Sequence, residues 1–240
     1  MSEVPEIISA ETIAAWSEDS YRIEKYGKDP SVVLIGEEHH RPDLISKQLE
    51  LIEMLDPEFV LHEFGSGWIH DPAKETTERQ PGRKWDAVEN PEESQVPREF
   101  IDHSNRMGYT IVGCDLTATE FALAELDIAR LNPKYEIVSL HERDLGHLDI
   151  PGDIYCKKLF QLIDPYREAK MIETIHEYRA KTTRPLVVVM GQIHASRIHR
   201  KGLMKGKDFG YVMVDQIGRR KPEKVDAVRN ATRKKATVIG

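Results

Sequence analysis

The sequence has little cysteine and no long apolar run, and each absence argues against a class of protein. Only two of the 240 residues are cysteines, Cys114 and Cys156, and they lie far apart. A disulfide framework or a cysteine-based zinc site is therefore not expected. No apolar run approaches the roughly 20 residues that span a bilayer, and the first residues, M-S-E-V-P-E-I-I, lack the basic start of a signal peptide. We expect a cytoplasmic protein with no membrane partner.

The charge is distributed unevenly along the chain. The formal net charge is -7, but residues 197–235 hold thirteen Lys or Arg against four Asp or Glu. A basic end of this kind can contact an anionic partner. Aromatic residues are not interleaved with these charges, as they often are in nucleic-acid-binding surfaces. We interpret the end at about 218–240 as a solvated basic extension and do not expect a nucleic-acid partner.

The pattern of apolar runs predicts one α/β domain covering 1–240. Unbroken apolar runs are typical of strands that are covered on both faces, as in a parallel sheet. Such a run occurs at 32–35, and further strands are predicted at 59–61, 109–112, 186–190 and 211–214. Apolar residues at helical spacing predict helices at 9–26, 42–55, 98–107, 117–131 and 166–180. The alternation of strands and helices favours a mostly parallel central sheet flanked by helices.

The stretch 65–97 interrupts this alternation. It contains Trp68, Trp85 and four prolines among many charges, and it is long for a connection inside a compact domain. We interpret it as an insertion or a lid. Its two tryptophans favour packing or substrate contact.

Polar residues follow the predicted strands at the point where each strand ends. In an open parallel sheet, ligands bind outside the carboxyl ends of the strands. Two of these ends share a pattern, an apolar run followed by Gly-x-x-His, in V-V-L-I-G-E-E-H-H and in L-V-V-V-M-G-Q-I-H. We expect the two segments to meet in space and to form one site. The candidate groups are Glu37, Glu38, His39, His40, Glu63, Asp115, Gln192 and His194.

Two imidazoles with one or two carboxylates are a common ligand set for Zn²⁺, Mn²⁺, Co²⁺ or Fe²⁺. A carboxylate that is not a ligand could then act as a general base. We expect His39, Glu63 and His194 to belong to this site.

Other candidates have simpler interpretations. We expect His40 and His62 at the surface or in a supporting position, and Glu38 facing solvent. Asp115 fits the start of a helix, where a carboxylate interacts favourably with the helix dipole. His176 and His199 are expected at the surface.

Four segments together resemble the TraB/Tiki/ChaN-like superfamily, which is related more distantly to the erythromycin esterases. They are V-V-L-I-G-E-E-H, F-V-L-H-E-F, Y-R-E-A-K-M-I-E-T-I and R-P-L-V-V-V-M-G-Q-I-H. The third resembles the Arg-Asp-x-x-Met-x-x-x-Ile helix of the group, with Glu168 where Asp is usual. The resemblance covers 31–64 and 166–194 and is nearest to the TraB branch.

The resemblance implies roles for particular residues. It implies His39 and His194 as the two motif histidines and Glu63 as the acid of the second strand. It implies Arg167 as the arginine that orients an acid or an oxyanion, and Glu37 as an acidic group of the site. Gln192-Ile193 departs from the small residues that are usual in the second motif and could narrow the pocket.

The branches of this superfamily differ in activity, so the resemblance leaves three functions open. Tiki-type members imply a metal-dependent peptidase or esterase-like hydrolase, acting on a peptide or small molecule, with His39, Glu63 and His194 as metal ligands. ChaN-like members imply a haem or iron carrier that uses the same histidines. The esterase branch implies a metal-independent hydrolase, in which His39 is the general base and Glu37 or Glu63 tunes it.

Overall fold

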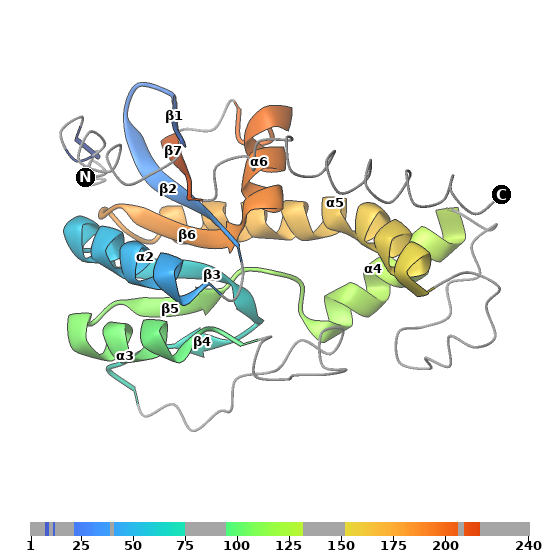
Figure 1. Ribbon diagram of the computed structural model, residues 1–240, viewed down its shortest axis with the longest axis horizontal. Coiled ribbons are helices and arrows are strands. Elements are labelled where there is room, and N and C mark those ends of the chain that lie inside the picture. Colours follow the sequence, from blue (N-terminus) through green and yellow to red (C-terminus); the bar gives the residue numbers. More distant parts are fainter. Residues whose placement is uncertain are drawn as a thin grey trace, which may run out of the picture.

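The computed structural model describes residues 8, 9, 12, 22–38, 41–74, 95–131, 152–205 and 209–216. Its centre is a seven-stranded sheet with the order β1-β7-β2-β6-β3-β5-β4 (Figure 1). The strands are β1 (Arg22–Tyr26), β2 (Pro30–Glu37), β3 (Phe59–Ser66), β4 (Ile69–His70), β5 (Thr110–Gly113), β6 (Leu186–Gly191) and β7 (Gly210–Asp215). Strands β7, β2, β6, β3 and β5 run parallel, and β1 and β4 pair antiparallel at the two edges. The predicted α/β fold with a mostly parallel sheet is confirmed.

Helices cover both faces of the sheet. They are α2 (Pro42–Leu55), α3 (Arg98–Met107), α4 (Ala118–Leu131), α5 (Gly152–Arg179) and α6 (Gln192–Lys201). Alternate residues of β2, such as Val33 and Ile35, pack with α2 and α3 in one core. Their neighbours Val32 and Leu34 pack with α5 and α6 in a second core. Burial on both faces explains why the strands read as unbroken apolar runs.

Helix α4 packs against α5 beside the sheet rather than on it (Figure 1). It begins with the capping box that Thr117 and Glu120 form. The Thr117 backbone N–H donates to Glu120 at 2.8 Å, and the Glu120 N–H donates to the Thr117 hydroxyl at 3.3 Å. Phe121 and Ile128 of α4 are buried together with Ile163 of α5.

The predicted helix at 9–26 is wrong at its C-terminal end, because 22–26 form strand β1. This strand pairs antiparallel with β7, from Arg22 opposite Asp215 to Tyr26 opposite Tyr211. The rings of Tyr26 and Tyr211 stack with their centroids 5.3 Å apart. Cross-strand pairs of this kind outweigh the weak helical preference of a short charged segment. Residues 13–21 of the predicted helix lie outside the described residues.

Two helices extend beyond the prediction. Helix α5 begins at Gly152, not at 166, and contains Pro165. A proline inside a helix costs about 3 kcal/mol or more, and the burial of Ile163 against α4 offsets part of that cost. Helix α6 starts directly at the end of β6 and was not predicted.

Parts of the predicted lid at 65–97 are regular. Strand β4 lies within it, and Trp68 is buried in the first core. Residues 75–94, with Trp85, lie outside the described residues, as does the predicted basic extension at about 218–240.

Candidate functional site

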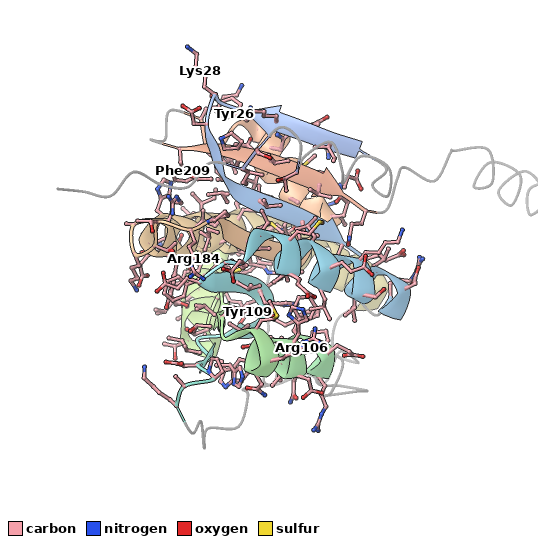
Figure 2. The ribbon with its side chains drawn as sticks, turned by 90° about the vertical axis from the view of Figure 1, so that its left-hand side faces the viewer. Tyr26, Lys28, Arg106, Tyr109, Arg184 and Phe209 are labelled. Carbon is pink, nitrogen blue, oxygen red and sulfur yellow. The ribbon has the colours of Figure 1, made fainter. Side chains whose placement is uncertain are left out.

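The two Gly-x-x-His segments begin at neighbouring points of the sheet. Strands β2 and β6 are adjacent and parallel, with Gly36 opposite Met190 and Glu37 opposite Gly191. The carboxyl ends of β3 and β5 lie on the same side of the sheet as those of β2 and β6. Figure 2 looks onto the opposite side, at the amino ends of the parallel strands, where Tyr109, Arg184 and Phe209 lie shortly before β5, β6 and β7. The polar strand ends are therefore gathered on one side of the molecule, as the sequence predicts.

Glu63 is the centre of a buried ionic network at this edge. Its Oε2 accepts a hydrogen bond from the Gly191 backbone N–H at 2.5 Å, and its Oε1 accepts from Arg167 Nη2 at 2.6 Å. Arg167 also donates to Asp115 Oδ2, from Nη2 at 2.6 Å and from Nε at 2.9 Å. Glu63, Arg167 and Asp115 are 1%, 5% and 0% exposed. A guanidinium that holds two carboxylates in this way fixes both carboxyl groups in orientation.

The charge of Arg167 is stabilised by these contacts. Burial lowers the pKa of Arg167, but the carboxylates of Asp115 and Glu63 outweigh burial and raise the pKa above its ordinary value. The side chain is therefore a permanent cation inside the protein. Asp115 was expected either as a group of the site or at the start of a helix, and it makes both kinds of contact. Its Oδ1 does accept from the Leu116 N–H at 2.7 Å, but its main partner is Arg167.

His194 lies in the first turn of α6, among three carboxylates. The Nε2 atom is 3.9 Å from Glu63 Oε1 and 4.0 Å from Asp164 Oδ1. The Nδ1 atom is 3.6 Å from Glu168 Oε1. The residue is 6% exposed.

Two acidic residues of α5 face two basic residues of α6. Arg197 forms ion pairs with Asp164 and with Glu168, and Lys201 Nζ lies 3.1 Å from Glu168 Oε2. Burial raises the pKa of Glu168, but His194 and Lys201 outweigh burial and hold the pKa below its ordinary value. The carboxylate that faces His194 is thus charged at neutral pH.

Counted over these contacts, four carboxylates face three permanent cations. The ionic network therefore has one negative charge in excess, before any proton on His194 is counted. Its members, besides His194, are Glu63, Asp115, Asp164, Glu168, Arg167, Arg197 and Lys201.

Glu37 is held on the other face of the sheet. The side-chain amide of Gln48, from α2, donates to Glu37 Oε2 at 3.1 Å and to Gln216 Oε1 at 2.8 Å. Glu63 instead contacts Arg167, from α5. Glu37 is 6% exposed. Glu37 and Glu63 thus both lie toward the carboxyl ends of parallel strands, but on the two opposite faces of the sheet.

The remaining predicted residues are placed as follows. His39 and His40 lie outside the described residues. The side chain of Glu38 is 41% exposed, as expected, and pairs with Arg41. His62 is completely buried, so the surface position, one of the two expected for it, is wrong. Its ring stacks on Phe64 and meets Phe100 edge-on in the core.

His176 and His199 were expected at the surface, and both are instead partly buried. His199 is largely covered, because it contacts Tyr211 and pairs with Glu24 of β1. His176 is partly buried and packs against Phe209. Ile193 of the second motif is 64% exposed.

The sequence analysis did not identify Asp164, Arg197 and Lys201 as members of the network. A signal was present, because positions 164, 167, 168, 171 and 175 follow helical spacing on one face of α5. Met171 and Ile175 of that face are fully buried. The prediction that the helix starts at 166 hid Asp164 from this pattern.

The expected metal ligands are only partly described. Among the described residues, no group of three or more His, Cys, Asp or Glu side chains could hold a metal ion. Glu63 and His194 are the two described members of the expected set. The third, His39, follows the end of β2 by two residues and lies outside the described part. Glu63 and His194 fit a ligand pair in chemistry, and the set is complete only with His39.

Comparisons with known proteins add no relative. No protein-family model matches the chain, and no curated protein or solved structure matches it. Within the described residues, no helix is long and apolar enough to cross a membrane.

Proposed function

We propose that the chain is a metal-dependent hydrolase of the TraB/Tiki type, a peptidase or an esterase. Its substrate is a peptide or a small molecule of the cytoplasm. The observation that carries this proposal is the pairing of β2 with β6, with Glu37 opposite Gly191. It supports a site to which both Gly-x-x-His segments contribute, beside Glu63. The proposal extends the resemblance of four sequence segments to a chemical role.

In this proposal, His39, Glu63 and His194 hold a divalent metal. The metal supplies Lewis-acid activation of the bond that is hydrolysed. Glu63 suits a ligand role, because its carboxylate is fixed by Arg167 and by the Gly191 N–H. We assign Arg167 the role of orienting Glu63, since its Nε and Nη2 are committed to carboxylates.

The remaining chemistry belongs to side chains near the metal ligands. Hydrolysis requires a base that takes a proton from water and an acid that returns one to the leaving group. Asp164 Oδ1 lies 4.0 Å from His194 Nε2, and Glu37 ends the strand that leads to His39. Because Glu63 is a metal ligand in this proposal, we assign Glu37, the acidic group of the β2 half of the site, the role of the base that activates water.

A second candidate is a metal-independent hydrolase with a histidine as general base. One observation favours it: the four carboxylates of the network are paired with Arg167, Arg197 and Lys201, so these contacts leave only one negative charge in excess. A divalent cation carries two positive charges, so binding one there would give the network a net positive charge. In this reading, Glu63 tunes the histidine instead of binding a metal.

One set of assays tests both candidates. Purified protein is incubated with chromogenic esters and with a fluorogenic peptide library, in Mn²⁺, in Co²⁺ and in chelator. The proposal predicts hydrolysis that metal stimulates and that His39→Ala, His194→Ala and Glu63→Gln abolish. Glu173→Gln, a change at an exposed site on α5, should retain full activity. Full activity in chelator selects the second candidate, and a folded protein without hydrolysis under any condition contradicts both.

A further inference from the structure

Glu168 lies between α5 and α6 and is 1% exposed. Its Oε2 is 3.1 Å from Lys201 Nζ, and its Oε1 is 3.4 Å from Arg197 Nη1. Two cations on one buried carboxylate keep it ionised, so both of its oxygens act as hydrogen-bond acceptors. The same Oε1 faces His194 Nδ1 at 3.6 Å. The carboxylate is thereby anchored from α6 while it faces a ring on the same helix.

The Nδ1 atom of His194 is buried and makes no hydrogen bond within 3.5 Å in the described part of the chain. Glu168 Oε1 is the polar group that faces it. A carboxylate oxygen can only accept, and both ring nitrogens face such oxygens. The nearest one is Glu168 Oε1, at 3.6 Å from Nδ1 against 3.9 and 4.0 Å from Nε2 to the others, so we place the proton of a neutral ring on Nδ1. A small rotation of the ring closes the 3.6 Å separation to a hydrogen bond.

The Nε2 atom then carries the lone pair. It faces Glu63 Oε1 at 3.9 Å and Asp164 Oδ1 at 4.0 Å. These separations are too long for direct hydrogen bonds, and they are suited to one small group between the three atoms. The ring thus presents its basic nitrogen to the carboxyl edge of the sheet, where Glu63 is fixed by Arg167.

We propose that Glu168 is the positioning residue of His194: it holds the proton on Nδ1 and directs Nε2 into the site. The assignment of a role to His194 rests on the proposed function, whereas the placement of its proton does not. Outer carboxylates that fix a histidine in this way serve metal ligands and general bases alike. The inference therefore holds for both candidate mechanisms.

The test is the tautomer of His194, read from long-range ¹H–¹⁵N correlation spectra of the ¹⁵N-labelled full chain in chelator. Spectra are recorded at a pH where titration shows the ring to be neutral, and His194→Gln assigns the signal. The expected result for the wild type is a protonated Nδ1 and an unprotonated Nε2. In Glu168→Gln, either end of the amide can face Nδ1, because Arg197 and Lys201 each contact one oxygen of the carboxylate. An amide oxygen is a weaker acceptor than a carboxylate, and an amide N–H₂ donates instead of accepting. Both orientations weaken the hold on the Nδ1 proton, so the share of rings protonated on Nε2 is expected to rise.

Glu173→Gln is the matched control, because it removes a carboxylate from an exposed position of the same helix. Its spectrum should equal that of the wild type. A wild-type ring protonated on Nε2, or a Glu168→Gln ring with the same share of Nδ1 protonation as the wild type, overturns the proposal. If Glu168→Gln does not fold, the wild-type spectrum alone decides.

Hydrolysis assays separate this inference from the proposed function. With a substrate found in the screen, Glu168→Gln should lower kcat about 10- to 100-fold and leave KM nearly unchanged. An active protein with the proton on Nε2 contradicts only the role of Glu168. An inactive protein with the proton on Nδ1 contradicts only the proposed function.

Discussion

Glu63 and Gly191 are joined by a 2.5 Å hydrogen bond from the backbone N–H of Gly191 to Glu63 Oε2. This bond ties β3 to the end of β6, at the point where α6 begins. The other oxygen of Glu63 binds Arg167 on α5. Because His194 follows Gly191 by three residues, the position of its ring is set relative to Glu63 by one short backbone segment.

Arg167→Met should strongly destabilise the protein. The change leaves Glu63 and Asp115 buried without their cation, and breaking a buried ion pair from one side costs about 3–5 kcal/mol. Urea unfolding at neutral pH measures the loss. Arg130→Met is the matched control, since Arg130 is 76% exposed and pairs with Asp127 on the surface. It should cost about 0–1 kcal/mol. Equal effects of the two changes would show that the Arg167 network contributes little to the fold.

Gly36→Ala should destabilise the protein through Gln192. A Cβ at Gly36 would lie 1.7 Å from Gln192 Oε1 and 3.2 Å from Gln192 Cα. The amide must move and lose its hydrogen bond to Ser196, so we expect a cost of about 1–3 kcal/mol.

A double-mutant cycle with Gln192→Ala checks the cause of that cost. The free energy lost in Gly36→Ala should be clearly smaller when residue 192 is already alanine. A residual cost is expected, because the Cα of residue 192 stays close. Strictly additive free energies of unfolding would exclude the contact as the reason for glycine at 36.

The apolar runs carried most of the prediction of the fold. Val32–Leu34 and Leu186–Val188 are buried on both faces, so their sequence alone indicates a covered parallel strand. The Gly-x-x-His pattern also predicted which strand ends share an edge. Strand β1 was not predictable in this way, because its sequence, R-I-E-K-Y, is not an unbroken apolar run. It lies at the outer edge of the sheet and is stabilised by its pairing with β7.

The ionic network could be predicted only in part, because its members come from separate elements. Glu63 and Asp115 were candidates because they follow predicted strands, and the resemblance implied Arg167, whereas Asp164 was not predicted. Asp115 pairs with Arg167, and Asp164 pairs with Arg197, which lie 52 and 33 positions further along the chain. Pairings over such separations depend on how α5 packs across the sheet, and no local pattern encodes that packing.

Glu120 should make stability depend on pH in the acid range. Burial raises the pKa of Glu120, but the ammonium of Lys170 and the Thr117 N–H outweigh it and lower the pKa below 4.5. A carboxyl group with a lowered pKa in the folded state stabilises the protein above its unfolded pKa. That stabilisation is lost as the pH falls through the folded value.

The check compares the wild type with Glu120→Gln, which retains an acceptor for the Thr117 N–H. The difference in unfolding free energy should be constant well above the ordinary pKa of glutamate, about 4.3, and should shrink as the pH falls below it. In a Lys170→Met background, where the 2.7 Å ion pair with Glu120 is absent, the pH dependence should be weaker. An unchanged pH dependence in that background would assign the effect to the capping box instead.

Metal binding should raise the melting temperature if His39, Glu63 and His194 are ligands. A ligand that binds only the folded state adds about 2.7 kcal/mol of stability at one hundred times its Kd. We expect Mn²⁺ or Co²⁺ to raise Tm in the wild type after treatment with chelator, and to leave Tm unchanged in His39→Ala and His194→Ala. His199→Gln is the control on α6. It loses the contact with Glu24 and so has a lower Tm without metal, but the increase on adding metal should be the same as in the wild type. An equal increase in His39→Ala would place the metal elsewhere, and no increase in the wild type would favour the metal-independent mechanism, in which the charges of Arg167, Arg197 and Lys201 suffice.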